Sequence, residues 1–144
     1  MKAVYLYPAT CYFEATPVSL GRGTSLPFQV YGHPNMTGYD YSLLQSVPAQ
    51  NRPLNKLCHG VNLSNMSDEE IWKRGVDLSY VIDAYKNLNI GDHFFRPFFE
   101  LLVGTDYVRK MIIEGKSAEE IKIRWKGDVE KFKEQRKPYL LYQE

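Results

Sequence analysis

Charged side chains are distributed unevenly along this chain of 144 residues. Residues 1–66 carry only six of the 35 lysine, arginine, aspartate and glutamate side chains, and residues 67–144 carry the other 29. An amphipathic helix needs a charged outer face beside its apolar one, so a charge-rich half is typical of surface helices. The distribution therefore predicts a helical second half. It does not by itself indicate two domains, because one domain of this length can bury a sizeable core.

Helix signals in the second half agree with this prediction. Ser67 with Glu70 and Ser117 with Glu120 both match the capping box that opens many helices. Apolar spacing predicts helices over residues 68–88 and from residue 117 to Arg136, and shorter ones over 98–102 and 106–114. Thr105 is the expected cap of the 106–114 helix, and Gly115 its stop. In the last helix the core-facing stripe is expected to consist of Ile121, Trp125, Val129 and Phe132.

The first half is predicted to form strands joined by loops. Residues 3–7, 28–31 and 56–63 are rich in β-branched and aromatic side chains and predict strands, the third one broken or bulged at Gly60. Residues 11–15 predict a short strand or a turn, 17–25 a loop, and 33–52 a long irregular segment of the kind that often binds ligands. Residues 139–142 are expected to dock on the sheet as an extended tail. The fold class predicted is α/β of the α+β type, a single domain over residues 1–144. Its small mixed or antiparallel sheet comes from the N-terminal half and is packed by three to four helices from the C-terminal half.

The candidate site lies in residues 7–34. Glu14 is the first acidic residue of the chain. Arg22 is the only lysine or arginine in this segment, and it stands between Gly21 and Gly23. Two glycines allow a tight turn that projects the guanidinium, whose planar fork suits a carboxylate or a phosphate. Two interpretations remain open: Arg22 binds an anionic ligand, or it pairs with Glu14 and only fixes the loop. Tyr31 and Tyr39 are further binding candidates, since each combines a flat ring with a hydroxyl.

Composition argues against several other functions. A net charge of +1 gives no global attraction to nucleic acid, and no apolar run is long enough to span a membrane. Residues 1–8 do not form a signal peptide. His33, His59 and His93 are far apart in sequence, so no metal site is predicted, and no cofactor is expected. Cys11 and Cys58 could form one disulfide, but two buried free thiols are favoured.

The same segment resembles the exo-β-N-acetylmuramidase (NamZ) family in its C-terminal part. The residues that carry the resemblance are Tyr7, Pro8, Cys11, Phe13, Glu14, Thr16, Ser19, Gly21, Arg22, Gly23, Thr24, Pro27 and Phe28. Further matches follow at residues 104–106, 115–121, Trp125 and 136–142, so the resemblance spans nearly the whole chain. Members of the family are longer, and a Rossmann-like domain precedes the part that this chain resembles.

The resemblance implies the release of terminal N-acetylmuramic acid from peptidoglycan fragments during cell-wall recycling, in the periplasm or outside the cell. The implied partners are a peptidoglycan-derived sugar or muropeptide and the Rossmann-like domain, with the cleft between the two parts. Glycoside hydrolysis generally needs two carboxylates, or one carboxylate and the substrate's acetamido group. Glu14 is the candidate catalytic residue here. Arg22, Gly21, Gly23, Thr24, Tyr31 and Tyr39 are the candidate substrate-binding residues. The isolated chain is expected to be inactive; a stand-alone muropeptide-binding module and a structural domain are the alternatives.

Overall fold

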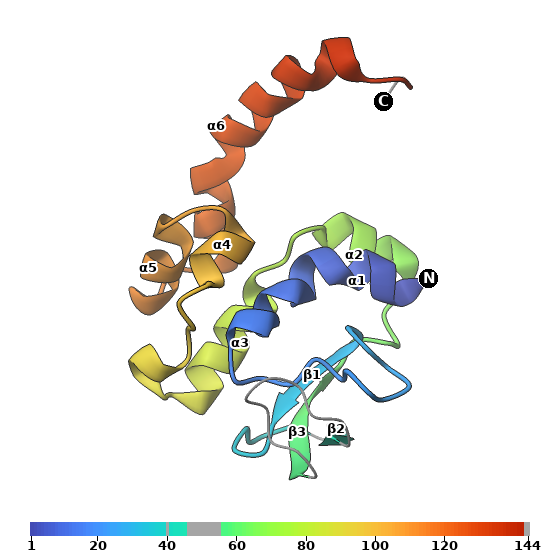
Figure 1. Ribbon diagram of the computed structural model, residues 1–144, viewed down its shortest axis with the longest axis vertical. Helices are drawn as coiled ribbons and strands as arrows, with labels where there is room; N and C mark the ends of the chain where they lie inside the picture. The colour runs from blue at the N-terminus through green and yellow to red at the C-terminus, as the bar shows by residue number, and fades with distance from the viewer. Residues whose placement is uncertain (40, 46–55, 143–144) are drawn as a thin grey trace.

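The fold is α+β, with a small sheet at one end and helices above it (Figure 1). The computed structural model describes residues 1–39, 41–45 and 56–142. The elements follow the order α1 (Lys2–Thr10), η1 (Cys11–Ala15), β1 (Val30–His33), β2 (Tyr41–Gln45), β3 (Lys56–Asn62), α2 (Asp68–Arg74), α3 (Ser79–Leu88), η2 (Gly91–His93), α4 (Phe99–Val103), α5 (Tyr107–Ile113), α6 (Ala118–Arg136) and η3 (Lys137–Tyr139). The predicted fold class is confirmed, although one helix, α1, comes from the N-terminal half.

The sheet is antiparallel, with β3 in the centre and the order β1-β3-β2. Gly60 pairs with Gly32 on one side and with Tyr41 on the other, and the register runs through it without a break. A Cβ on Gly60 would lie 1.9 Å from the Tyr31 carbonyl oxygen. The prediction of a break or bulge at Gly60 is therefore wrong, and the glycine instead allows a close approach of two backbones.

The prediction of a strand at residues 3–7 is also wrong, because these residues belong to α1. Leu6, Ala9 and Thr10 are buried along one side of this helix, at the spacing of helical neighbours. Pro8 lies inside it and removes the hydrogen bond to the Val4 carbonyl. Val4 is exposed, so water can satisfy that carbonyl, and burial of the opposite side stabilises the helix.

Three other first-half segments differ from the predictions. Residues 11–15 form a 3-10 helix, and the second predicted strand is shifted to Val30–His33. The segment predicted as irregular contains β2, which is only five residues long. The rest of that segment falls partly on Asp40 and residues 46–55, outside the described residues.

In the second half both capping boxes form as predicted, with Ser67 and Ser117 accepting from the amides of Glu70 and Glu120. The single helix predicted over residues 68–88 is two helices, because Gly75 adopts a φ of +60° at the end of α2. Asp106, not Thr105, precedes α5, and neither side chain caps it. The positive φ of Gly115 follows α5 as expected of a stop signal.

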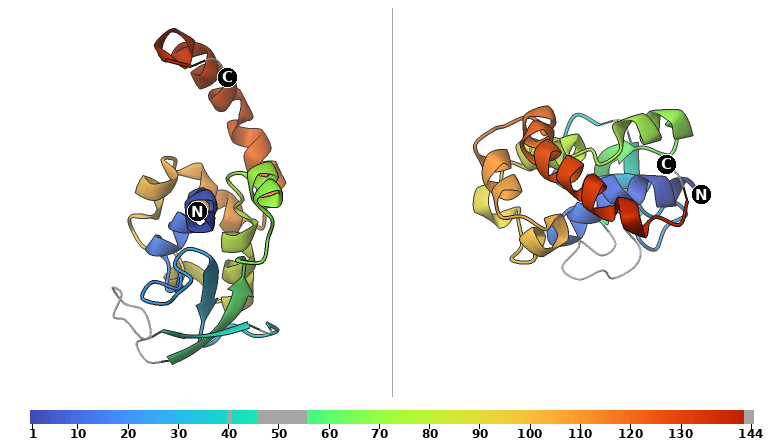
Figure 2. Two further views of the ribbon diagram at one scale, coloured as in Figure 1. Left: turned by 90° about the vertical axis from the view of Figure 1, so that its right-hand side faces the viewer. Right: turned by 90° about the horizontal axis from the view of Figure 1, so that it is seen from above.

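Helix α6 departs furthest from its prediction. Ile121 is buried and Trp125 packs at the edge of the core, but Val129 and Phe132 are exposed. The helix extends away from the body of the molecule, and the C-terminus lies far from the sheet (Figures 1 and 2). Residues 139–142 therefore do not dock on the sheet: Tyr139, Leu141 and Tyr142 are exposed. No helix in the described part of the chain is long and apolar enough to cross a membrane.

Candidate functional site

Residues 16–28 form a loop that is held on the sheet rather than free in solvent. Val18, Ser19 and Leu20 are fully buried. The Ser19 amide donates to the Gly32 carbonyl (2.7 Å), the Gly32 amide donates back to Ser19 (3.0 Å), and the Phe28 amide donates to the Leu20 carbonyl (2.8 Å). One bridge thus joins the loop to the edge of β1, and the segments on both sides of residues 21–24 are held in place.

A tight turn at residues 21–24 projects Arg22 from this loop. The Thr24 amide and hydroxyl both donate to the Gly21 carbonyl, at 3.1 and 2.6 Å, and the Leu26 amide donates to the Thr24 hydroxyl at 3.1 Å. Gly21 and Gly23 have φ values of +69° and +80°, which L residues rarely adopt. A Cβ on Gly21 would also lie 2.5 Å from Val30 Cγ2. Gly21, Gly23 and Thr24 therefore shape the backbone under Arg22.

Arg22 forms an ion pair with Glu14, through Nη2 and Oε1. Its guanidinium carbon lies 4.8 Å from the centre of the Phe28 ring. The Tyr7 ring packs against the same Phe28 ring, with 4.9 Å between the two ring centres. The Arg22 side chain keeps 48% of its surface exposed and the Glu14 side chain 25%. A carboxylate and an aromatic face thus orient a guanidinium that ligands can reach.

Cys11 lies three residues before Glu14, and its surroundings favour the protonated thiol. Burial, and then the charge of Glu14, raise the pKa of the Cys11 thiol, so the thiol stays protonated near neutral pH. Cys11 and Cys58 are both free, as predicted, but only Cys58 is buried and Cys11 is partly exposed. Burial also raises the pKa of Cys58.

Tyr31 and Tyr39 belong to a second cluster, which is built around Asp83 of α3. The Tyr31 and Tyr39 hydroxyls donate to the same oxygen, Asp83 Oδ2, at 2.9 and 2.6 Å. Burial and the Asp83 carboxylate raise the pKa of both phenols well above their usual value, so both remain neutral donors. The Tyr31 side chain is only 3% exposed and its ring stacks on Phe13 at 4.8 Å. Tyr31 is thus placed in the core, while Tyr39 stays partly exposed.

No sequence signal identifies Asp83, which looks like one more charged residue on an outer helix face. Its neighbour Asn87 makes two hydrogen bonds to the backbone of Thr37, at 3.0 and 2.9 Å, and so fixes the segment that carries Tyr39. Only the packing of this segment on α3 brings these residues together.

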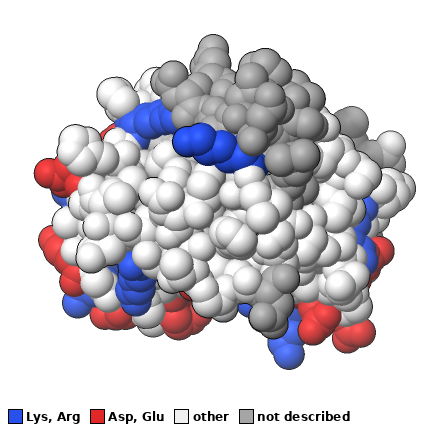
Figure 3. Space-filling model, turned by 90° about the horizontal axis from the view of Figure 1, so that it is seen from below, with Lys and Arg blue, Asp and Glu red and all other residues white. Residues whose placement is uncertain are grey.

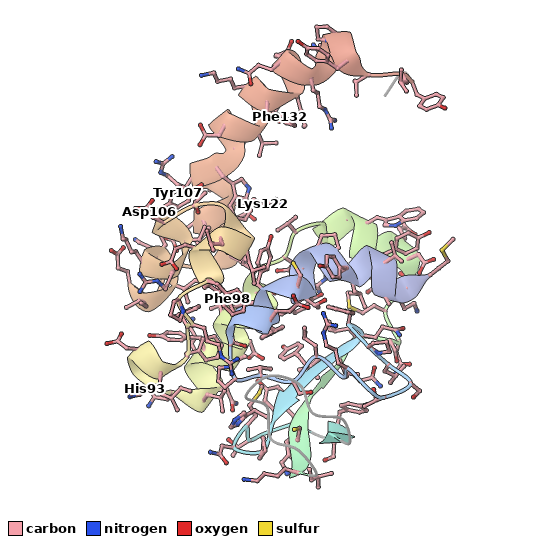
Figure 4. All side chains as sticks on the ribbon, viewed as in Figure 1. His93, Phe98, Asp106, Tyr107, Lys122 and Phe132 are labelled. Carbon is pink, nitrogen blue, oxygen red and sulfur yellow. The ribbon has the colours of Figure 1, made fainter. Side chains whose placement is uncertain are left out.

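Within residues 1–39, 41–45 and 56–142, no three His, Cys, Asp or Glu side chains are arranged to hold a metal ion. His33 and His59 face each other across β1 and β3, but the Asn35 amide donates to His33 Nδ1 (3.1 Å). This bond occupies the Nδ1 lone pair and places the proton of a neutral His33 on Nε2, so neither nitrogen offers a free lone pair to a metal. His93 lies at η2, and Figure 4 places it near the foot of the helical part.

Taken together, the fold and the site define a small α+β domain that presents one arginine–carboxylate pair on a rigid, glycine-turned loop. Seen from below, the described surface at the sheet end is uncharged over most of its middle, and most of its charged side chains lie toward its edges (Figure 3). The sequence profile described as "Exo-beta-N-acetylmuramidase NamZ, C-terminal" matches residues 5–142. The chain therefore belongs to the NamZ C-terminal family, as the motif in its first 28 residues predicted.

Individual relatives agree with this assignment. The chain is 29% identical, over 99% of its length, to a Bacillus subtilis protein described as peptidoglycan beta-N-acetylmuramidase NamZ. It is 77% identical over its full length to a DUF1343 family protein from Bacteroides fragilis, whose crystal structure superposes with a TM-score of 0.94. A second Bacteroides fragilis structure of that family, at 19% identity and a TM-score of 0.66, shares the fold. The chain spans 38% of the Bacillus protein and 42% of each Bacteroides chain.

Proposed function

We propose that this chain is the cleft-completing portion of a β-N-acetylmuramidase that acts on peptidoglycan fragments and contributes to cell-wall recycling. Its membership of the NamZ C-terminal family supports this proposal, as does the printed activity of its Bacillus subtilis relative. The chain corresponds to less than half of that relative. Its proposed contribution is therefore substrate recognition rather than the complete reaction.

The exposure of Arg22 is the observation that carries the proposal. N-acetylglucosamine and N-acetylmuramic acid alternate in peptidoglycan, and only the second bears a lactyl carboxylate. An enzyme that selects muramic acid benefits from a cation at that position. Arg22 is half exposed, rests on Phe28 and is held by Glu14, so its guanidinium is oriented before a ligand arrives.

Glu14 is proposed to hold Arg22 in this orientation and to line the cleft as a carboxylate. A catalytic role would require the glycosidic oxygen or the anomeric carbon to come within hydrogen-bonding reach of Glu14. Gly21, Gly23 and Thr24 are proposed to act through the turn that they form. Tyr39 is proposed to contact the sugar from its exposed side, whereas burial restricts Tyr31 to supporting Tyr39 through Asp83.

The experiment compares ligands that differ in the lactyl carboxylate. N-acetylmuramic acid and N-acetylglucosamine are titrated into the chain, and backbone amide shifts are followed by NMR. The unchanged chain is expected to prefer the muramic ligand. Arg22→Ala should reduce that preference roughly ten- to a hundredfold, the effect of ~1.5–3 kcal/mol for a charge-assisted hydrogen bond, and Arg22→Lys should fall between.

Arg74 provides the matched control, because it forms an exposed ion pair with Asp77 (3.1 Å) and its side chain is 51% exposed. Arg74→Ala should leave both affinities unchanged. If Arg22→Ala weakens both ligands equally while the fold stays intact, Arg22 is a structural partner of Glu14 and the carboxylate-recognition proposal is wrong. Turnover of a muramic acid glycoside by the 144-residue chain alone would contradict the cleft-completing role.

A further inference from the structure

Helix α6 exposes apolar side chains that a helix in water would normally bury. Across its 19 residues only Ile121 is buried. Val129 and Phe132 are 43% and 59% exposed, although they continue the stripe that starts at Ile121. In proteins, most of the stability of a helix comes from the packing of its apolar face against other elements. The outer half of α6 lacks such packing within the described part of the chain.

The base of α6 borders an apolar cavity of about 540 Å³. The cavity lies between α6 and the body, and its apolar lining includes Tyr12, Val76, Leu78, Trp125, Val129 and Phe132. Figure 4 shows the two limits of this surface, Tyr107 beside the start of α6 and Phe132 on its projecting part. We call this surface the α6 groove.

Two polar groups in the α6 groove are consistent with a missing partner. The hydroxyl oxygen of Thr105 is buried and has no hydrogen-bond partner among the described residues. Such a group normally costs free energy unless something satisfies it. Asp128 is the charged residue of the lining. An occupant that fits would present apolar side chains together with a hydrogen-bonding group for Thr105 and a donor or cation for Asp128.

The arrangement of the chain ends indicates where such an occupant would enter. Helix α6 curves over the side of the molecule on which α1 begins, and the N-terminus lies beneath its far end (Figure 1). The view from above also places the two ends on the same side (Figure 2). Polypeptide joined ahead of Lys2 would therefore start next to the space that α6 overhangs, beside the exposed side chains of Val4 and Trp72.

We propose that the α6 groove is the docking surface for the polypeptide that precedes this domain in its longer relatives. Those relatives supply the occupant: 58% of the 77% identical Bacteroides fragilis chain lies outside the part that this chain covers, and the family is the C-terminal part of NamZ. The inference deepens the proposed function, since it assigns the surface that joins the two parts. It does not depend on the role of Arg22.

The test uses a chimera in which these 144 residues replace their counterpart in the full-length Bacteroides fragilis relative. Amide hydrogen exchange is measured for α6 in the chimera and in the 144-residue chain alone. In the chimera, the amides of residues 125–132 are expected to exchange at least about tenfold more slowly. Equal exchange rates in the two proteins would overturn the proposal.

Two variants of the chimera locate the contact on α6. Phe132→Glu places a charge in the α6 groove and should abolish the added protection. Ile123→Glu is the matched control, because Ile123 is 64% exposed on the same helix but lies outside the α6 groove. It should leave the protection unchanged. An equal loss of protection in both variants would mean that a charge anywhere on α6 has this effect, and would overturn the assignment of the contact to the α6 groove.

The mass of the 144-residue chain in solution tests the competing occupant, a second copy. A monomer at tens of micromolar supports the proposal. A dimer that Phe132→Glu dissociates would show that the α6 groove binds another copy, and would overturn it. Failure here is separable from failure of the proposed function, because the muramic acid preference is measured through Arg22, on a different surface.

Discussion

The loop of residues 16–28 and helix α6 combine regularity and burial in opposite ways. The loop has almost no regular structure, yet Val18, Ser19 and Leu20 are fully buried. Helix α6 is regular over 19 residues, yet most of it is exposed. Hydrogen bonding within a helix is local and needs no neighbours, whereas the loop is fixed by bonds to β1 and by side chains in the core. Regular structure is therefore a poor guide to which part of this molecule is firmly held.

The largest effect is expected from comparing core truncations in the two regions. Leu20→Ala should lower the free energy of unfolding by about 2–5 kcal/mol, because it leaves a cavity under the loop. Phe132→Ala should change it by less than about 0.5 kcal/mol in the 144-residue chain, where Phe132 is exposed. Urea denaturation of both variants measures the difference. Similar losses would mean that α6 is packed in solution and would break the comparison.

A smaller effect is expected from glycines with positive φ. Gly21→Ala should cost about 2–4 kcal/mol, because the strained backbone angle is combined with a Cβ 2.5 Å from Val30 Cγ2. Gly115→Ala, ahead of α6, has a φ of +81° but open space around the new Cβ, and should cost about 1 kcal/mol. Thermal unfolding of the two variants measures the contribution of packing beyond backbone strain. Equal costs would mean that the loop adjusts at residue 21.

The two capping boxes sharpen the comparison, because their chemistry is the same and their surroundings differ. Ser67→Ala and Ser117→Ala each remove the side-chain acceptor of a first-turn amide, worth about 1 kcal/mol. Ser117→Ala should mainly fray α6, so helical circular dichroism falls while the main unfolding transition moves little. Ser67→Ala should lower the main transition, since α2 packs on α1. The opposite pattern would indicate that α6 unfolds together with the core.

The smallest effect concerns pH. Hydrogen bonds from Ser67 and Ser117 lower the pKa of Glu70 and Glu120 below the usual 4.5. A carboxyl whose pKa is lower in the folded state stabilises that state above its usual pKa. That contribution is lost as the pH falls below about 4.5 and through the folded pKa. Side-chain NMR titration should show both pKa values depressed. Ser117→Ala should raise only the pKa of Glu120, and only in part, because the backbone amide of residue 117 still donates to the carboxylate. A Glu120 titration that the substitution leaves unchanged would contradict this cause.

Several features of the fold and the site followed from local sequence, because their causes are local. The capping boxes need only residues three positions apart, and the Glu14–Arg22 pair lies within one short segment. Other predictions failed where the deciding contact is distant. Residues 3–7 have strand-like side chains, but Leu6 and Ala9 bury one side of a helix. Gly60 reads as a bulge until its close approach to Gly32 and Tyr31 is known.

The sequence by itself determined the family, the fold class, the starts of α2 and α6 and the loop that carries Arg22. Each of these depends on residue types at short spacing, and short-range geometry is nearly independent of the rest of the chain. Only the tertiary structure decided that Tyr31 and Tyr39 share Asp83, 52 and 44 residues further on. It also decided that the apolar stripe of α6 leaves the core after Trp125. An apolar stripe specifies that a helix face prefers a partner, but where that partner lies depends on how all the elements pack.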